Sequence, residues 1–591
     1  MSHPRSQTPA AYQWRLEDIF PSNEAWEQEF DQARTLSDEL AARAGTLGQS
    51  ADSLYAALDL QSRLSLHLER LYVYARMRRD EDNGNTLYQG MADRAMQLSV
   101  SVQAATSGFQ PEILAIDPDT LRAWAAEPRF DRFRFELEDL DRQREHVLSP
   151  AEERILALAG DPLTGPNNIF TMLNNVDLDF GTIQNEAGQQ VPLTHGSYST
   201  FLQSPDRRVR QDAYRGLYKA YQGMKNTIAA TYAASVKSDL FSARARGYEG
   251  CLEAALFAGN VPTQVYTQLL EAVHEGLPAL HKYVGLRKKL LGLSQLEMYD
   301  LYTPLIPEQS QSMTYEEAQV LVREALAPLG ENYQALLDRA FTEGWIDVYE
   351  NDGKTSGAYS WGVYGVHPYV LLNHQNTLES AFTLAHELGH AMHSYHSDAA
   401  NPYELAQYRI MVAEVASTVN ESLLMRYLLD RETEPSRRAW LLNKFLEQVR
   451  TTCFRQTLFA EFELKAHRMA EQGEPLTVQS LSNVYKELNK TYYQGVNVDE
   501  DAAIEWMRIP HFYRAFYVYQ YATGICSALA LSSDVLDRGG LSRYLRFLSS
   551  GGSDYPIREL QDAGVDLTSK EPIRSAMALF AKRVDELASL V

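Results

Sequence analysis

Cysteine is rare in this chain of 591 residues, which contains only Cys251, Cys453 and Cys526. Three cysteines so far apart exclude a disulfide framework, and they also exclude a cysteine-rich zinc site. Scarce cysteine is typical of proteins in a reducing compartment, so we expect a cytoplasmic location.

Long apolar runs are also missing. No stretch approaches the roughly 20 apolar residues that a helix needs to cross a bilayer. The first residues, MSHPRSQTP, contain no apolar segment of the kind found in a signal peptide. The sequence therefore predicts neither membrane insertion nor secretion.

Positive charge is in deficit. Lysine and arginine together number 55 against 78 aspartates and glutamates, which gives a net charge of −23 at pH 7. Such a surface repels nucleic acids and anionic membranes, so we expect neither as a partner. The hydrophobic fraction of 45% and the charged fraction of 23% are ordinary for a globular protein.

No proline-rich linker, low-complexity tract or repeat of fixed period divides the chain. Apolar residues recur at helical spacing over 25–153, and helical patterns resume after 205. Between them, alternating residues around 176–192 predict a small hairpin. We therefore predict a mainly α protein with an N-terminal helical region, 1–200, and a second region, 201–591.

The most informative motif is His386-Glu387-Leu-Gly-His390. Residues four apart on a helix differ by about 40° and about 6 Å, so both imidazoles can reach one metal ion. Glu387 lies about 60° from His390, where it can contact a water on that metal. The motif predicts a zinc site with a general base. The alternative to a zinc site is that the two histidines are buried and hydrogen-bonded and have only a structural role. Asn376 and Glu379 are predicted to cap the start of this helix.

A hydrolytic zinc site usually has three protein ligands and one open position, so a third ligand is expected elsewhere. Glu414 is the candidate, because it lies among apolar residues where an unpaired carboxylate is costly. Residues 401–404 have the features of a helix start, so a second helix would run back antiparallel to the first. An ion pair between Glu414 and Arg409 is the alternative. Glu421, seven residues later on the same face, is expected to support a ligand histidine or to form a salt bridge, and not to bind the metal.

The segment before the motif is rich in glycine and aromatic residues, and Tyr369–Asn373 has the pattern of a short strand. A strand beside a metal cleft can bind an extended peptide through its backbone. We therefore predict a small sheet near 355–375, next to the zinc helix, in which Tyr369–Asn373 pairs with substrate. A purely structural hairpin is the alternative.

Five stretches carry a family resemblance: Ser356–Gly362, Pro368–Asn373, His386–His393, Ala413–Thr418 and Pro510–Gly524. They resemble the thimet oligopeptidase and neurolysin family of zinc metallopeptidases, in particular its oligoendopeptidase F branch. The resemblance extends over most of the chain. It implies a mainly helical, two-lobed metallopeptidase with a deep substrate channel, which cleaves short peptides and not folded proteins.

The same resemblance points to the tyrosine-rich segment 509–521. Peptide hydrolysis builds negative charge on the carbonyl oxygen, and hydrogen-bond donors aimed at that oxygen stabilise it. By resemblance, His511 and Tyr519 are the first candidates for this contact, and Tyr513 and Tyr517 are the next. Tyr521 fits an aromatic core position equally well.

The expected function is that of a zinc-dependent endopeptidase, with one zinc ion held by His386, His390 and Glu414. Glu387 would act as general base, so that a zinc-bound water attacks internal bonds of short unstructured peptides. A zinc carboxypeptidase or dipeptidase on a similar fold is one alternative, and it would need a cation for the terminal carboxylate. A non-catalytic peptide-binding protein with a structural metal is another. Subsite preferences and oligomeric state do not follow from the sequence.

Overall fold

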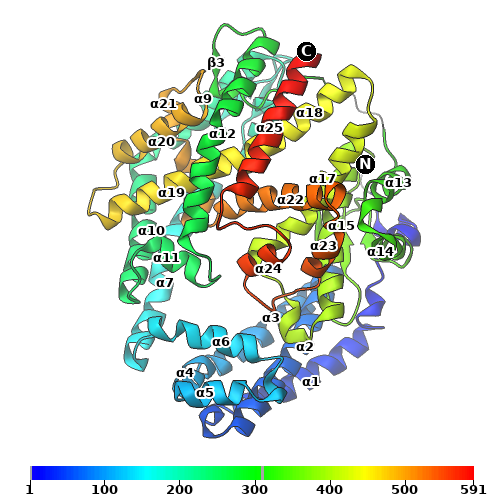
Figure 1. Cartoon of the computed structure of the whole chain (residues 1–591), viewed down its shortest axis with the longest axis vertical. Helices are drawn as coiled ribbons and strands as arrows, with labels where there is room; N and C mark the ends of the chain where they lie inside the picture. Colours follow the sequence, from blue (N-terminus) through cyan, green and yellow to red (C-terminus); the bar gives the residue numbers. More distant parts are fainter. Residues whose placement is uncertain (1–2, 308–311) are drawn as a thin grey trace. The chain divides into compact units, whose positions relative to one another are not determined.

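The computed structural model describes residues 3–307 and 312–591, and nearly all of its regular structure is helical (Figure 1). The prediction of a mainly α protein is thus confirmed. The chain folds into two compact units, each made of three segments. Unit 1 comprises Met1–Val147, Ser310–Arg426 and Leu531–Gly564, and unit 2 comprises Leu148–Gln309, Tyr427–Ala530 and Val565–Val591. The division of the sequence at residue 200 stays a prediction.

Unit 1 contains the motif helix and a three-stranded sheet. Its elements are α1 (Asn23–Ala41), α2 (Ala51–Glu81), α3 (Thr86–Thr106), α4 (Phe109–Leu114), α5 (Pro118–Ala125), α6 (Arg134–Gln143), α13 (Tyr315–Ala325), α14 (Glu331–Thr342), β4 (Ile346–Asp347), β5 (Tyr359–Trp361), β6 (Tyr369–Leu371), α15 (Leu378–Ala400), α16 (Tyr403–Ala406), α17 (Ile410–Arg431), α23 (Leu541–Leu548) and α24 (Pro556–Asp562). The last residues of α17 belong to unit 2.

Unit 2 holds the other helices and two small two-stranded sheets. Its elements are α7 (Pro150–Met172), β1 (Thr182–Gln184), β2 (Gln190–Pro192), α8 (His195–Leu202), α9 (Arg207–Gly223), α10 (Lys225–Ala245), α11 (Cys251–Phe257), α12 (Thr263–Leu290), β3 (Leu296–Glu297), α18 (Pro435–Val449), α19 (Arg455–Glu471), α20 (Val478–Tyr492), β7 (Val496–Asn497), α21 (Glu500–Ala503), α22 (Tyr519–Asp537) and α25 (Glu571–Leu590). The last residues of α22, from Leu531, belong to unit 1. The antiparallel pair β1 and β2 confirms the predicted hairpin.

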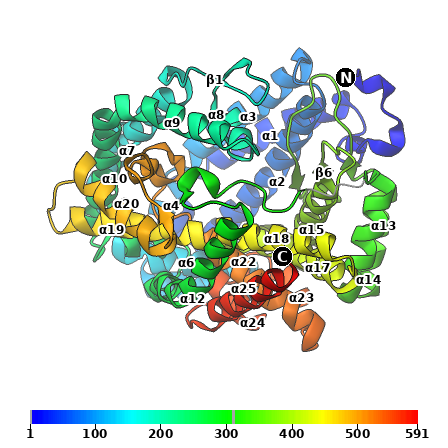
Figure 2. The ribbon, with the colours of Figure 1, turned by 90° about the horizontal axis from the view of Figure 1, so that it is seen from above.

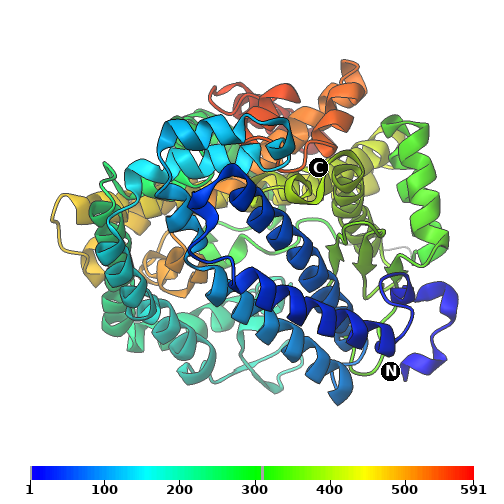
Figure 3. The ribbon, with the colours of Figure 1, turned by 90° about the horizontal axis from the view of Figure 1, so that it is seen from below.

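The N-terminal helices of unit 1 form a bundle, in which α2 packs against both α1 and α3 (Figure 3, blue). Leu54, Leu64 and Leu71 of α2 recur at helical spacing and are fully buried. Trp26 of α1 is also fully buried, and its indole nitrogen donates to the Leu71 carbonyl oxygen over 2.9 Å. This hydrogen bond removes the cost of burying the polar end of the ring.

In the sheet of unit 1, β6 is the central strand. It pairs parallel with β4 and antiparallel with β5, so Val370 has a neighbour on each side. Beyond the strand, the Leu372 and His374 amides donate to the carbonyl oxygens of residues 347 and 348. The prediction that a peptide pairs with Tyr369–Asn373 is therefore wrong, because that strand already has backbone partners. The strand at the edge of the sheet beside α15 is β5.

The motif helix α15 packs against β5 and β6, and α13 and α14 lie beside it (Figure 2). Thr377 is its N-cap and accepts a hydrogen bond from the Ser380 amide over 3.2 Å. The predicted cap by Asn376 and Glu379 is wrong. Asn376 adopts a left-handed conformation with φ of 53°, so it forms the turn before the helix instead.

A helix does begin after Pro402, as predicted, but it ends after one turn at Ala406, and α17 starts separately at Ile410. The carbonyl oxygens of Leu405 and Ala406 accept hydrogen bonds from the Gly552 amide and the Ser397 hydroxyl. Those oxygens are satisfied outside the helix, which explains the break. Among residues 3–307 and 312–591, no helix has the length and apolar character that a membrane span requires.

Candidate metal centre

The site is built on two antiparallel helices, α15 and α17. The side-chain amide of Asn420, on α17, donates to the Ala385 carbonyl oxygen of α15 over 3.0 Å. Further along α15, His390 lies opposite Glu414, which comes before Asn420 on α17, so the two helices run in opposite directions. Tyr333 of α14 donates to the Asn420 side-chain oxygen, also over 3.0 Å. These hydrogen bonds fix the register of the two helices, which confirms the predicted antiparallel arrangement.

Three predicted ligands converge between these helices. Glu414 Oε2 lies 3.5 Å from Nε2 of His386 and 3.5 Å from Nε2 of His390. All three atoms lie within 4.8 Å of one another. In the part of the chain that the structure describes, no other group of three histidine, cysteine, aspartate or glutamate side chains is arranged in this way.

Glu421 contacts His386, the first histidine of the motif, as predicted. Its carboxylate is hydrogen-bonded to Nδ1 of His386, which leaves Nε2 of that ring directed at the ligand group. The Ser417 hydroxyl donates to Glu414 Oε2 over 3.1 Å, so the carboxylate ligand is also oriented. Arg409, the alternative partner of Glu414, forms an ion pair with Asp139 at 3.1 Å.

The charges of the site favour a cation. The hydrogen bond with His390 is the main cause that lowers the pKa of Glu414 to about 2. Burial opposes the charged form of His386, but the hydrogen bond with Glu421 and nearby carboxylates raise the pKa of this ring to about 8. Glu414 is thus held in its anionic form beside the two imidazoles, and two imidazole nitrogens with one carboxylate oxygen form a donor set found in hydrolytic zinc sites.

Glu387 is next to these three candidate ligands and does not belong to their group. Only 7% of its surface is exposed. Burial raises its pKa, although the two histidines act in the opposite direction. A carboxylate with a raised pKa beside a metal site is suited to accept a proton near neutral pH.

The candidate donors to the transition state lie in unit 2. His511 is exposed in the helical turn Pro510–Tyr513. The Tyr521 hydroxyl lies 3.4 Å from Nε2 of His511, and the ring of Tyr517 is nearly parallel to the imidazole at 6.2 Å. The structure therefore groups Tyr521 with His511. His511 and Tyr521 are ten residues apart and only Tyr521 belongs to α22, so no helical spacing in the sequence indicated this pairing.

Two other tyrosines of this segment are in different surroundings. Tyr519 is 3% exposed, and its ring lies 5.2 Å from that of Tyr266. Tyr513 stacks on Phe170 at 4.3 Å. Burial raises the pKa of both hydroxyls. Their catalytic role stays a prediction.

Comparison with protein families gives two matches. Residues 200–579, more than half of the chain, match the model of peptidase family M3. Residues 112–180 match a model described as oligopeptidase F.

Individual relatives cover nearly the whole chain. It is 46% identical to oligopeptidase PepF of Bacillus subtilis, over 99% of this chain and 88% of that protein. It is 39% identical to group B oligopeptidase PepB of Streptococcus agalactiae, over 100% of this chain and 99% of that protein. The crystal structure of oligoendopeptidase-F from Enterococcus faecium is similar with a TM-score of 0.75 and 37% identity, over 96% of this chain and 99% of the other.

Proposed function

Because this chain belongs to peptidase family M3 and is a metallo-oligopeptidase, we propose that it is a zinc-dependent endopeptidase that cleaves internal bonds of short, unstructured peptides. The observation that carries this proposal is the convergence of His386, His390 and Glu414 beside the buried carboxylate of Glu387. The scarcity of cysteine supports a cytoplasmic location.

The protein side chains have separate tasks. Zinc held by His386, His390 and Glu414 would polarise the scissile carbonyl group and activate water. Glu387 would accept a proton during attack and return it to the leaving amine, a role that its raised pKa supports. Glu421 would keep His386 in the required tautomer and orientation.

We propose that the substrate binds along the edge of β5 that is not paired with β6. Among the residues that the structure describes, this strand pairs with another strand, β6, on one side only, and it packs against α15. An extended peptide can add to such an edge through backbone hydrogen bonds, which accept many sequences. This mode requires free backbone on both sides of the scissile bond, so it favours unstructured peptides.

We also propose that His511 contributes a hydrogen bond to the transition state, as the family resemblance implies. Its exposure and the neighbouring Tyr517 and Tyr521 support this role. His511→Gln is expected to lower kcat by about 10-fold or more, with unchanged zinc content, because one donor to the developing charge is lost. Equal kcat values for the variant and the wild-type protein would contradict the role.

Products from a mixed peptide library test the main proposal. The zinc-loaded protein is incubated with the library, and the products are identified by mass spectrometry. Glu387→Gln is the matched control for contaminating peptidases. Internal cleavage is expected. Removal of single C-terminal residues, or of dipeptides from one end, would instead identify an exopeptidase.

A further inference from the structure

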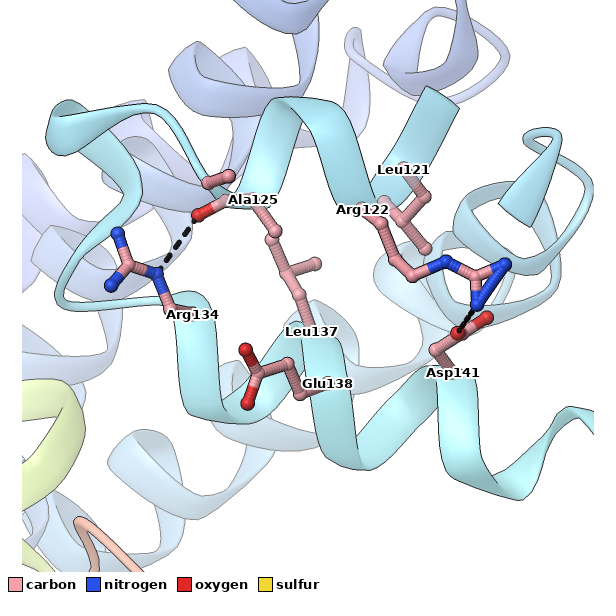
Figure 4. A pocket seen from close by; sticks show the side chains of 8 residues that line it. Leu121, Arg122, Ala125, Arg134, Leu137, Glu138 and Asp141 are labelled. Carbon is pink, nitrogen blue, oxygen red and sulfur yellow. Dashed lines mark hydrogen bonds and ion pairs between the residues drawn. The ribbon is translucent and has the colours of Figure 1, made fainter. Parts of the chain in front are cut away.

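The cavity between α5 and α6 of unit 1 has a volume of about 550 Å³ (Figure 4). Both arginines of its lining already have protein partners: Arg134 donates to the Ala125 carbonyl oxygen at 3.2 Å, and Arg122 pairs with Asp141 at 3.6 Å. We therefore assign no ligand to this cavity. The feature that calls for a functional explanation is a strained turn in unit 2, within the segment that carries His511.

The turn is formed at Phe516, which has a φ of 55°. Among the residues that the structure describes, the other non-glycine residues with positive φ are Asn260 and Asn376. Asparagine tolerates this conformation much better than a bulky aromatic residue does. Such a strained backbone persists only where neighbouring groups fix it, and strain of this kind is concentrated at functional sites.

The Phe516 amide is fixed by a buried carboxyl group. It donates to Oε1 of Glu463 over 3.1 Å, and Glu463 is fully buried on α19. Burial is the main cause that raises the pKa of Glu463 well above its usual range, although the hydrogen bond from Phe516 acts in the opposite direction. Burial therefore favours the neutral acid, whose carbonyl oxygen can accept this hydrogen bond.

The Phe516 side chain is fixed as well. The centroid of its ring lies 4.6 Å from that of His467 and 5.7 Å from that of Tyr266. The Tyr266 hydroxyl donates in turn to the Ala460 carbonyl oxygen over 2.6 Å. Ala460, Glu463 and His467 recur at helical spacing along α19. One face of this helix therefore fixes both the backbone and the ring of Phe516.

The turn decides where the next tyrosines lie. Phe516 is between the helical turn that carries His511 and the start of α22 at Tyr519. After Phe516 the chain returns, so that the Tyr517 ring is nearly parallel to the imidazole of His511 and the Tyr521 hydroxyl lies 3.4 Å from its Nε2. An ordinary backbone conformation at Phe516 would direct the following residues elsewhere. The arrangement of His511 with these two tyrosines therefore depends on the turn.

We propose that Glu463 is a positioning residue: by accepting the hydrogen bond from the Phe516 amide, it maintains the turn that keeps His511 beside Tyr521 during peptide hydrolysis. The inference rests on the proposed function. It adds to that function a residue that acts only through the position of His511.

The test measures kcat, KM and zinc content of zinc-loaded variants with one cleaved peptide. Glu463→Leu removes the acceptor and keeps a similar volume, whereas Glu463→Gln keeps a neutral acceptor. Glu461→Leu is the matched control, because it removes a carboxyl group of the same helix that contacts His274 and Tyr492 instead. His511→Gln, alone and combined with Glu463→Leu, shows whether the two residues act through one contact.

Glu463→Leu is expected to lower kcat by about fivefold or more, with KM within about twofold of the wild type and unchanged zinc content. Glu463→Gln should keep kcat within about twofold of the wild type, because its amide oxygen still accepts the hydrogen bond. Glu461→Leu should leave kcat unchanged. In the His511→Gln background, Glu463→Leu should cause little further loss, because the contact that it disturbs is already absent.

The inference is ruled out by a wild-type kcat in Glu463→Leu, by an equally low kcat in Glu463→Gln or Glu461→Leu, or by a full additional loss in the His511→Gln background. If Glu463→Leu does not fold, Phe516→Gly relaxes the same turn with Glu463 in place. It should lower kcat in the same way, and an unchanged kcat would rule the inference out. Failure of the wild type to cleave any peptide would contradict the proposed function instead.

Discussion

Gly389 on α15 lies directly against the backbone of Ser417 on α17. A Cβ atom at position 389 would be 2.5 Å from Ser417 Cα and 2.7 Å from the Ala416 carbonyl oxygen. Only glycine allows the two backbones to come this close. Because His386 and His390 flank Gly389, and Glu414 is three residues before Ser417, this contact sets the distance between the two helices that carry the candidate ligands.

Gly389→Ala tests this relationship. The added methyl group must push the helices apart, so we expect at least about a 10-fold loss of zinc affinity and a destabilisation of about 1–3 kcal/mol. Zinc titration against a competing chelator and thermal unfolding measure the two effects. Gly90→Ala is the matched control, because a Cβ at this exposed helical position meets nothing within 4 Å. Normal zinc affinity in Gly389→Ala would show that the helix spacing is not limiting.

Glu387 and Glu414 should respond differently to substitution. Glu387→Gln is nearly isosteric and leaves all three ligands in place, so one zinc per chain should remain while peptide turnover falls by at least about 10²-fold. Glu414→Ala removes a ligand and should lose zinc. Elemental analysis and peptide kinetics distinguish the two outcomes. Full activity of Glu387→Gln, or active wild-type protein without a transition metal, would refute the assigned chemistry.

Binding at the β5 edge predicts selection for unstructured substrates. The same cleavable sequence is offered once as a free peptide and once within a surface loop of a stable protein, at identical zinc concentration and pH. The free peptide should be cleaved much faster, because only it can extend its backbone on both sides of the scissile bond. Comparable rates for the two substrates would exclude this binding mode.

Glu559 on α24 predicts a pH dependence of stability. It is 5% exposed, and its Oε1 has no partner among the described atoms. Burial, followed by the charge of Asp554, raises the pKa of Glu559 to about 8. The folded state therefore binds this proton more tightly than the unfolded state, and the resulting stability is lost as the pH rises from about 4.5 to about 8.

Glu559→Gln keeps a neutral side chain of similar size at every pH. The melting temperature of the variant should exceed that of the wild type by an amount that grows between about pH 5 and about pH 9, reaching about 2 °C or more. Differential scanning calorimetry across this range measures the difference. A difference that does not change with pH would mean that Glu559 does not ionise in this interval.

Local patterns in the sequence predicted the helical class, the two candidate histidine ligands and the neighbouring Glu387. Helical spacing alone places His386 and His390 on one face, whatever packs around them. Glu414 was also predictable, because a carboxylate in an apolar segment needs a partner. The partnership of Glu421 with His386 was one of two predictions that followed from its position seven residues after Glu414, on the same helix face.

Only the tertiary structure decided how distant segments meet. Which strand is central and which is at the edge depends on pairing between segments far apart in the chain, so the sequence could not assign the free edge to β5 instead of Tyr369–Asn373. The end of α16 depends on the distant Gly552, and the burial of Tyr519 on its contact with Tyr266. The contact of Gly389 with Ser417 is likewise visible only in the fold, because a glycine within a helix does not reveal which backbone it approaches.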